Sequence, residues 1–360
     1  MGTPTETAAH EHPPSHGYDH GHDHGHDHGA PARGFSRARA IWLVVGVLGV
    51  AGLLALRSLA TEGGVPLPNQ LQDLLTLAFS VIVESLPFVI LGILLSIVVQ
   101  AWLPDDLLQR YLPRNAVLRR FCISLFGIAL PVCECGNVPL ARGLVMKGFT
   151  VSESMTFLLA APIVNPVTII TTHAAFGFDD GILVARILGG LAIANIVGWL
   201  FSLHPRQDDL LTPSFAAECA RGDHSEGSRP QRSLAIFVRE TSVIMPALFI
   251  GALIAGAIQV AVPREVLVSL GSNPLWSVLA MMVLAFVIAV CSSVDAFFIL
   301  PFASTFLPGS IVTFLVFGPI IDVKMLAIMR TTYTTRTLVQ LTVVVGLLSA
   351  LIGLVVNVLA

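Results

Sequence analysis

Long apolar stretches alternate with short polar ones along the chain from residue 40 onward. The apolar runs cover about 40–56, 71–102, 118–132, 136–148, 154–176, 181–203, 234–262, 275–307, 310–329 and 338–358. Several are longer than the roughly 20 residues that an α-helix needs to cross a hydrocarbon core about 30 Å thick. Barrel strands would need only about 9–11 residues. The pattern therefore predicts an all-α, polytopic integral membrane protein.

Composition strengthens this prediction and excludes other classes of protein. Hydrophobic residues make up 54% of the chain and charged residues only 12%, whereas an average soluble domain has about 25% charged residues. The mean hydropathy is +0.81. No basic patch with interleaved aromatic residues occurs, so nucleic acid is not an expected partner. The lipid bilayer is the expected surrounding, and a homo-oligomer is compatible with the sequence.

The first 38 residues are polar and lack the basic-then-apolar pattern of a cleavable signal. Their Gly- and Asp-rich composition predicts a disordered cytoplasmic tail, followed by an extra transmembrane helix at 39–60. The tail's eight histidines suit borderline metals and predict a weak metal site. These are His10, His12, His16, His20, His22, His24, His26 and His28. A solvated tail without a ligand role remains the alternative.

Two later stretches of the chain share landmark residues at identical spacing, which indicates an internal repeat. The paired landmarks are Pro87 and Pro246, Gly92 and Gly251, Gln100 and Gln259, and Pro104 and Pro263. "PIVN" at 162–165 is answered by "PIID" at 319–322. We therefore expect one permease-like repeat at 71–203 and a second at 234–358. A flexible, polar cytoplasmic linker at 204–233 would join them.

Lys and Arg placement predicts the orientation of the spans, because short loops rich in these residues stay in the cytoplasm. The rule places the N-terminus on the cytoplasmic side, together with segments 103–120 and 142–153, the second of which begins with Arg142. These segments flank the stretch "LPVCECGNVPLARG", residues 130–143. This stretch is then the tip of a re-entrant hairpin. The second copy is inverted relative to the first. About eight spans and two hairpins in the inner membrane would follow, a plan common among secondary transporters.

Polar residues cluster at the predicted breaks, although each is costly within a membrane. Pro131 and Pro139 are expected to break the first hairpin and Gly136 to permit its turn. "CSSVD" at 291–295 is the counterpart in the second copy. The candidate substrate-binding residues are Cys133, Glu134, Cys135, Asn137, Asn165, Cys291, Ser292, Asp295 and Asp322.

Thiols and carboxylates together suit soft and borderline cations, and thiols also suit trivalent arsenic. We expect Cys133 and Cys135 to act as ligands, and Glu134 and Asp295 as charge partners or proton acceptors. The alternative for the cysteines is structural packing. Asn165 and Asp322 are expected to supply polar contacts, with Asp322 partly neutralised by Lys324. Glu84 and Glu240 are expected near the membrane interface, and Cys219 is expected to have no role.

The stretches "CECGNVPLARGLVMKGFTVSESMTFLLAAPIVNP", "CSSVDAFFILPF" and "FGPIIDVKML" resemble the ArsP-like predicted permease family over roughly residues 70–358. Its characterised members export organoarsenicals or other soft-element compounds. The resemblance implies pathway residues at Cys133, Cys135, Asn165, Cys291 and Asp322. Many members have a serine between the two cysteines. Here Glu134 adds an anionic ligand at that position, which favours a cationic cargo.

These observations predict a membrane permease, not an enzyme, that exports a soft metal, metalloid or organometalloid species by alternating access. No resident cofactor is expected, and a transition metal would be cargo. The sequence has no phosphate-binding loop of the G-x-x-x-x-G-K-[ST] type. Two alternatives remain open. One is a transmembrane thiol-disulfide oxidoreductase, and the other is a metal-sensing membrane subunit.

Overall fold

A computed structural model describes residue 2 and residues 69–104, 110–130, 132–178, 180–221, 228–261 and 274–359. Within these ranges the chain is α-helical, and its β-structure is limited to one isolated bridge between Leu211 and Tyr333. Within the described ranges, five helical stretches are long and apolar enough to cross a membrane. The expected all-α polytopic architecture is confirmed. The histidine tail and the expected helix at 39–60 lie outside the described residues.

The first half of the fold runs from residue 69 to residue 202. The long helix α2 ends in a turn of π-helix, and shorter helices follow it. Their bounds are α2 Asn69–Ile97, η1 Val98–Trp102, α4 Ala116–Ser124, α5 Phe126–Ala129, α6 Glu134–Met146, α7 Val151–Val164, α8 Pro166–Phe176 and α9 Ile182–Ser202. The helical path is interrupted between α5 and α6, and again at Asn165 between α7 and α8.

The second half shows the same order of long helix, break, short helix and second break. Its elements are α11 Arg229–Ala261, α13 Pro274–Ile288, α14 Asp295–Ile299, η3 Leu300–Phe302, α15 Pro308–Phe317, α16 Val323–Met329 and α17 Thr335–Leu359. The breaks lie at 289–294 and 318–322. The inverted relation between the halves and the count of eight spans stay predictions.

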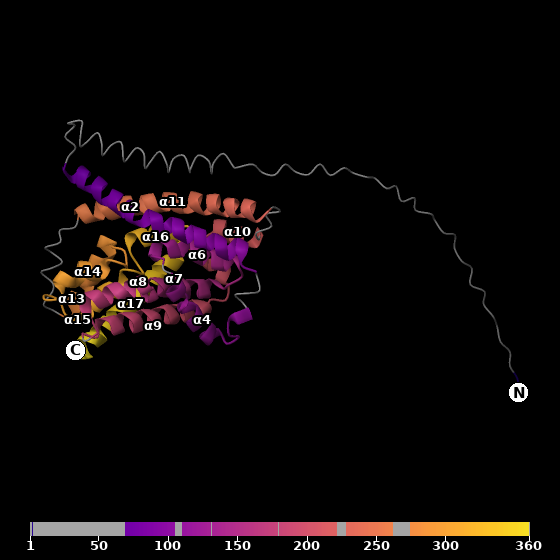
Figure 1. Cartoon of the computed structure of the whole chain (residues 1–360). Helices are drawn as coiled ribbons and strands as arrows, with labels where there is room; N and C mark the ends of the chain where they lie inside the picture. Colours follow the sequence, from indigo (N-terminus) through magenta and orange to yellow (C-terminus); the bar gives the residue numbers. More distant parts are fainter. Residues whose placement is uncertain are drawn as a thin grey trace, which may run out of the picture.

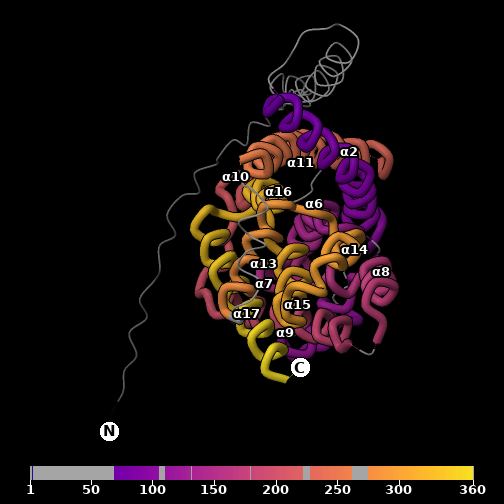
Figure 2. The backbone as a smooth tube through the Cα atoms, turned by 90° about the vertical axis from the view of Figure 1, so that its left-hand side faces the viewer, coloured from indigo at the N-terminus to yellow at the C-terminus, as the bar shows by residue number. Residues whose placement is uncertain are grey.

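The helices form two layers with two short helices between them. Figures 1 and 2 show α2 and α11 side by side on one face, and α9, α15 and α17 on the opposite side. Helix α6 packs against α2 and α7, and α16 packs against α11 and α6. Both short helices begin directly after a break. The first residues of these helices, Glu134 and Val323, are buried, so both N-terminal ends lie inside the molecule.

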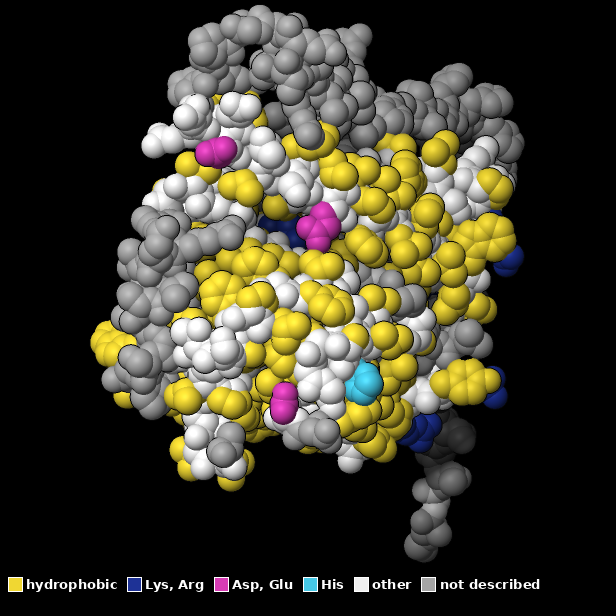
Figure 3. All heavy atoms as spheres, turned by 60° about the vertical axis from the view of Figure 1, so that its left-hand side comes forward, with side chains coloured by type: hydrophobic (Ala, Val, Ile, Leu, Met, Phe, Trp, Pro, Cys, Tyr) yellow, Lys and Arg dark blue, Asp and Glu magenta, His cyan; other side chains and the backbone are white. Residues whose placement is uncertain are grey.

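The outer surface is largely apolar, as a lipid-facing surface should be. Large aliphatic side chains such as Leu188 and Leu347 are 62% and 68% exposed. Figure 3 shows one such face, with a hollow where a basic side chain is visible behind an acidic one. Charged groups therefore reach toward this apolar face from the interior.

Local sequence explains two of the helix breaks. The side chain of Asn165 accepts a hydrogen bond from the Val167 N–H at 2.9 Å and donates one to the Val132 carbonyl at 3.0 Å. It thereby caps α8, whose first residue Pro166 has no N–H to pair. Asp322 caps α16 in the same way, by accepting from the Met325 N–H. These residues satisfy backbone groups that a break would otherwise leave unpaired.

The expectation for Pro139 and Gly136 is wrong, because both lie inside helix α6. The break precedes them and ends at Cys133, the residue before the helix begins. Gly136 instead permits close packing. A Cβ atom there would collide with the Phe88 carbonyl oxygen, and one on Gly92 would collide with the Gly136 backbone. The two glycines let α2 and α6 approach until their backbones touch.

Replacing Gly92 by alanine is expected to lower the stability of the protein by about 1–3 kcal/mol, because the added methyl group overpacks a backbone contact. Thermal unfolding of the detergent-solubilised protein would measure the change. Gly346→Ala is the matched control, since a Cβ atom there would meet no backbone, only the flexible tip of Met282 at 3.3 Å and the Phe317 ring at an ordinary 3.8 Å. Equal unfolding temperatures for the two variants would contradict the close-packing interpretation.

The segment after α9 also differs from expectation. Residues 207–221 were expected to belong to a flexible connector, but they form η2 Gln207–Leu210 and α10 Pro213–Arg221. The Thr212 N–H donates to the Thr332 carbonyl at 2.9 Å, and Phe215 is 1% exposed. Buried contacts rather than local composition order this segment. The sequence pattern alone did not reveal them.

Candidate functional site

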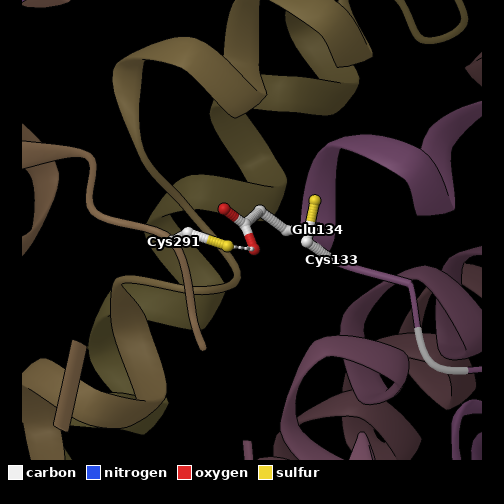
Figure 4. A group of neighbouring side chains, drawn as sticks. All are labelled: Cys133, Glu134 and Cys291. Atoms are coloured by element: carbon white, nitrogen blue, oxygen red, sulfur yellow. Dashed lines mark hydrogen bonds between the residues drawn. The ribbon is translucent and has the colours of Figure 1, made fainter. Parts of the chain in front are cut away.

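Residues from both halves of the chain meet where α6 begins. Cys133 and Glu134 stand at the N-terminal end of α6, and Cys291 lies in the break between α13 and α14. Their ligand atoms all lie within 4.8 Å of one another, and no residue of the three is more than 4% exposed. Figure 4 shows the Glu134 carboxylate directed at the Cys291 thiol. Among the described residues, this is the group of thiols and carboxylates that could hold a metal ion.

The Glu134 carboxylate is held by partners on both oxygens. Its Oε2 accepts hydrogen bonds from the Ser292 hydroxyl at 3.1 Å and from the Cys291 thiol at 3.6 Å. Its Oε1 forms an ion pair with Lys324 Nζ at 3.2 Å. As the first residue of α6, Glu134 also faces the positive end of a helix dipole. These contacts offset the cost of burying a charge.

Lys324 pairs mainly with a different carboxylate from the one expected. Its Nζ lies 3.2 Å from Glu134 Oε1 but 4.0 Å from Asp322 Oδ2. It also donates to the Ala289 carbonyl at 3.3 Å. Lys324 therefore does contact Asp322, as expected, but this is the longer of its two ion pairs. The stronger pair joins residues 190 positions apart.

Three other predicted site residues lie on or beside α6. Cys135 is buried and donates to the Ser85 hydroxyl at 3.9 Å, outside the group formed by Cys133, Glu134 and Cys291. Asn165 holds the backbone at a break, as described above. Asn137 is fully buried, and neither its Oδ1 nor its Nδ2 has a hydrogen-bond partner within the described part of the chain. Asn137 stands one turn after Cys133 on the same helix face.

Asp295 is engaged by an arginine that sequence reasoning missed. Arg186 of α9 donates to Asp295 Oδ1 at 3.0 Å and to Oδ2 at 2.6 Å, and both residues are at most 2% exposed. Arg186 also donates to the Thr172 hydroxyl at 2.7 Å. The pair is bidentate, the strongest geometry for these groups. A lone arginine within a 21-residue apolar helix was the signal, because buried charges in membranes are usually paired.

Glu84 on α2 belongs to the surroundings of the site, not to an isolated interface. It lies near the Cys291 backbone and near the charges of Lys324 and Glu134. Unlike those residues it is only partly buried. Glu84 is therefore more exposed than the fully buried carboxylate of Glu134.

A second group of charges lies toward the other end of α6. Arg142 Nε contacts Glu240 Oε2 at 2.8 Å, and Arg142 NH2 contacts Glu218 Oε2 at 3.3 Å. Arg239 bonds the same two carboxylates, with its Nε 2.8 Å from Glu218 Oε1 and its NH2 3.3 Å from Glu240 Oε1. The Arg142 guanidinium also stacks on Phe215 of α10, 4.0 Å from the ring centroid. We call these four charged residues the four-charge cluster.

The four-charge cluster corrects two expectations. Glu240 is fully buried in an ion pair rather than placed at the membrane interface. Arg142 is 1% exposed inside α6, so it is not a charge in a flanking loop. The orientation of the spans is then predicted by the other Lys and Arg residues of the loops.

The remaining cysteines lie outside the site. Cys122 and Cys219 are free and only partly buried. Burial and the neighbouring Glu218 raise the pKa of the Cys219 thiol to about 11. At neutral pH it stays protonated and is a poor metal ligand. The histidines of the tail lie outside the described residues.

Comparisons with known proteins agree on the class of protein. The family model ArsP_1, described as "Predicted permease", matches residues 70–358. The chain is 36% identical over 262 residues to UPF0718 protein YcgR of Bacillus subtilis, covering 71% of this chain and 87% of the relative. It is 33% identical over 277 residues to a Streptococcus mutans protein described as a two-component membrane permease complex subunit, covering 76% and 91%. No solved structure matches.

Proposed function

The chain belongs to the ArsP_1 family of predicted permeases, and from this premise we propose that it exports a soft or borderline metal cation, or a trivalent metalloid species. The observation that carries the proposal is the buried group of Cys133, Glu134 and Cys291. Two sulfurs and one carboxylate oxygen suit Cu(I), Zn²⁺ and similar ions. The carboxylate is an anionic ligand, and it favours a positively charged cargo.

The origin of the ligands supports transport by alternating access. Cys133 and Glu134 come from the first half of the chain, and Cys291 from the second. A rocking movement of one half against the other would separate the ligands and release the cargo. Each thiol that binds a metal ion gives up its proton. Two thiols would thus release two protons on binding, which would couple cargo movement to proton movement.

We place the protein in the inner membrane with its N-terminus in the cytoplasm. The histidine-rich tail would then collect metal ions on the side from which export begins. The Streptococcus mutans relative is described as a subunit of a two-component complex. We propose that this chain can likewise assemble with a second membrane subunit.

Cys133→Ser and Cys291→Ser are each expected to weaken Cd²⁺ binding to the purified protein by at least about 100-fold. Each removes a direct ligand, and even outer-shell changes at metal sites cost about 10–100-fold. Calorimetric titration measures the affinity, and survival of cells on Cd²⁺, Zn²⁺, copper and trivalent arsenic measures export. Cys122→Ser and Cys219→Ser are the matched controls and should behave like the unmodified protein.

Two results would decide against this function. Unchanged affinity and unchanged resistance in the Cys133→Ser, Cys291→Ser double variant would refute a metal site at these residues. Capture of Cys133 in a mixed disulfide with a thioredoxin-like protein would favour the thiol-disulfide oxidoreductase instead.

A further inference from the structure

The ammonium group of Lys324 occupies the place of a cation in the candidate site. Its Nζ lies 3.2 Å from Glu134 Oε1, and the residue is 1% exposed. The other oxygen of Glu134 faces Ser292 and Cys291. A metal ion bound by Cys133, Glu134 and Cys291 would therefore approach a carboxylate that already has a positive partner.

A second acceptor for Lys324 lies beside the first. Asp322 uses its Oδ1 to cap α16. Its Oδ2 is buried, has no hydrogen-bond partner in the described part of the chain, and lies 4.0 Å from Lys324 Nζ. A buried carboxylate oxygen without a hydrogen bond is unfavourable. A small change of the lysine side chain would satisfy it.

Two other buried cations, Arg186 and Arg142, and the half-buried Arg239 have carboxylate partners of their own. Arg186 is bound in bidentate fashion to Asp295, and Arg142 and Arg239 are balanced within the four-charge cluster. Lys324 is thus the described cation that lies between the Glu134 carboxylate of the candidate site and a second buried carboxylate, Asp322. Two cations on one buried carboxylate would repel each other strongly, because charges interact more strongly in a poorly polar interior.

We propose that Lys324 is a tethered counter-cation that determines which cargo binds. In the empty site it pairs with Glu134. When a metal cation binds Cys133, Glu134 and Cys291, Lys324 moves to Asp322. The site then favours a cargo whose positive charge can displace an ammonium group, over a neutral metalloid that needs only the thiols. This inference rests on the proposed function and names the charge of its substrate.

Binding of Cd²⁺ to the purified full-length protein, measured by calorimetric titration, tests the exchange. Lys324→Gln removes the competitor and is expected to tighten binding about tenfold or more. Asp322→Asn is expected to weaken binding about tenfold, because position 322 then offers Lys324 no negative charge. Opposite shifts from residues only two positions apart could not come from a general loss of folding. Lys147→Gln changes the other lysine in the chain, and should leave affinity unchanged.

The Lys324→Gln variant leaves two buried carboxylates with less charge balance and so could fail to fold. The double variant Asp322→Asn, Lys324→Gln avoids this, keeps Glu134 anionic, and should also bind Cd²⁺ more tightly than the unmodified protein. If the lysine variants that fold bind no tighter, or if Asp322→Asn alone binds equally well or better, the inference is overturned. Retention of normal affinity by the Cys133→Ser, Cys291→Ser double variant would instead refute the proposed function.

Discussion

Replacing Arg186 by methionine is expected to lower the free energy of unfolding by about 3–5 kcal/mol, because Asp295 would keep a buried charge without its partner. The two side chains form two hydrogen bonds, of 3.0 Å and 2.6 Å, and both are shielded from the surroundings. They also join α9 to the start of α14, so their loss would loosen the break at 289–294. Thermal unfolding of the detergent-solubilised protein would show the effect.

The double variant Arg186→Met, Asp295→Leu is the control for this prediction. It removes both charges, and replacing a complete buried pair by apolar groups is often neutral or stabilising. Recovery of most of the lost stability would show that the unpaired carboxylate caused the damage. A double variant as unstable as Arg186→Met would instead point to lost packing around Thr172.

Replacing Arg142 by methionine is expected to cost about 3 kcal/mol, because it leaves the four-charge cluster with two carboxylates and one guanidinium. The change also removes the stacking on Phe215. Helix α10 should detach, since Arg142 contacts both Glu218 and Phe215 on it. Faster proteolytic cleavage within residues 207–221, together with a lower unfolding temperature, would measure this.

Arg206→Met provides a contrast on the surface. Arg206 pairs with Asp209 at 3.0 Å, but its side chain is 81% exposed. Exposed pairs contribute only about 0–1 kcal/mol, so its loss should leave stability and cleavage nearly unchanged. Equal behaviour of the Arg142 and Arg206 variants would contradict the role given to the four-charge cluster.

The positions of the helix breaks were largely predictable. Polar residues and prolines at Cys133, Asn165 and Asp322 interrupt apolar runs, and the helices do end or begin there. The prediction of a break at Pro139 is wrong, because a proline within a helix interrupts hydrogen bonding without always ending the helix. The prediction of a turn at Gly136 is wrong for a related reason. Sequence alone does not distinguish a glycine that turns the chain from one that admits a neighbouring helix.

The members of the candidate site were predictable as a set, but their partners were not. Cys133, Glu134 and Cys291 stood out because thiols and carboxylates are unusual in apolar runs. Lys324 stands out in the sequence, but spacing pairs it with its sequence neighbour Asp322. Arg186 lies alone within an apolar helix, with no acidic residue in that helix to suggest its partner. In each case the true partner lies in a distant element, so spacing along the chain carries no information about the pair.

The sequence by itself determined the membrane class, the helical architecture and the places where helices break, because these depend on hydropathy and on local backbone chemistry. Only the tertiary structure decided which charges meet. Lys324 pairs with Glu134, 190 positions away in the sequence. Arg186 pairs with Asp295, 109 positions away, and Arg142 pairs with Glu240, 98 positions away. Electrostatic attraction acts through space, and each buried charge takes the partner that helix packing places within about 3 Å.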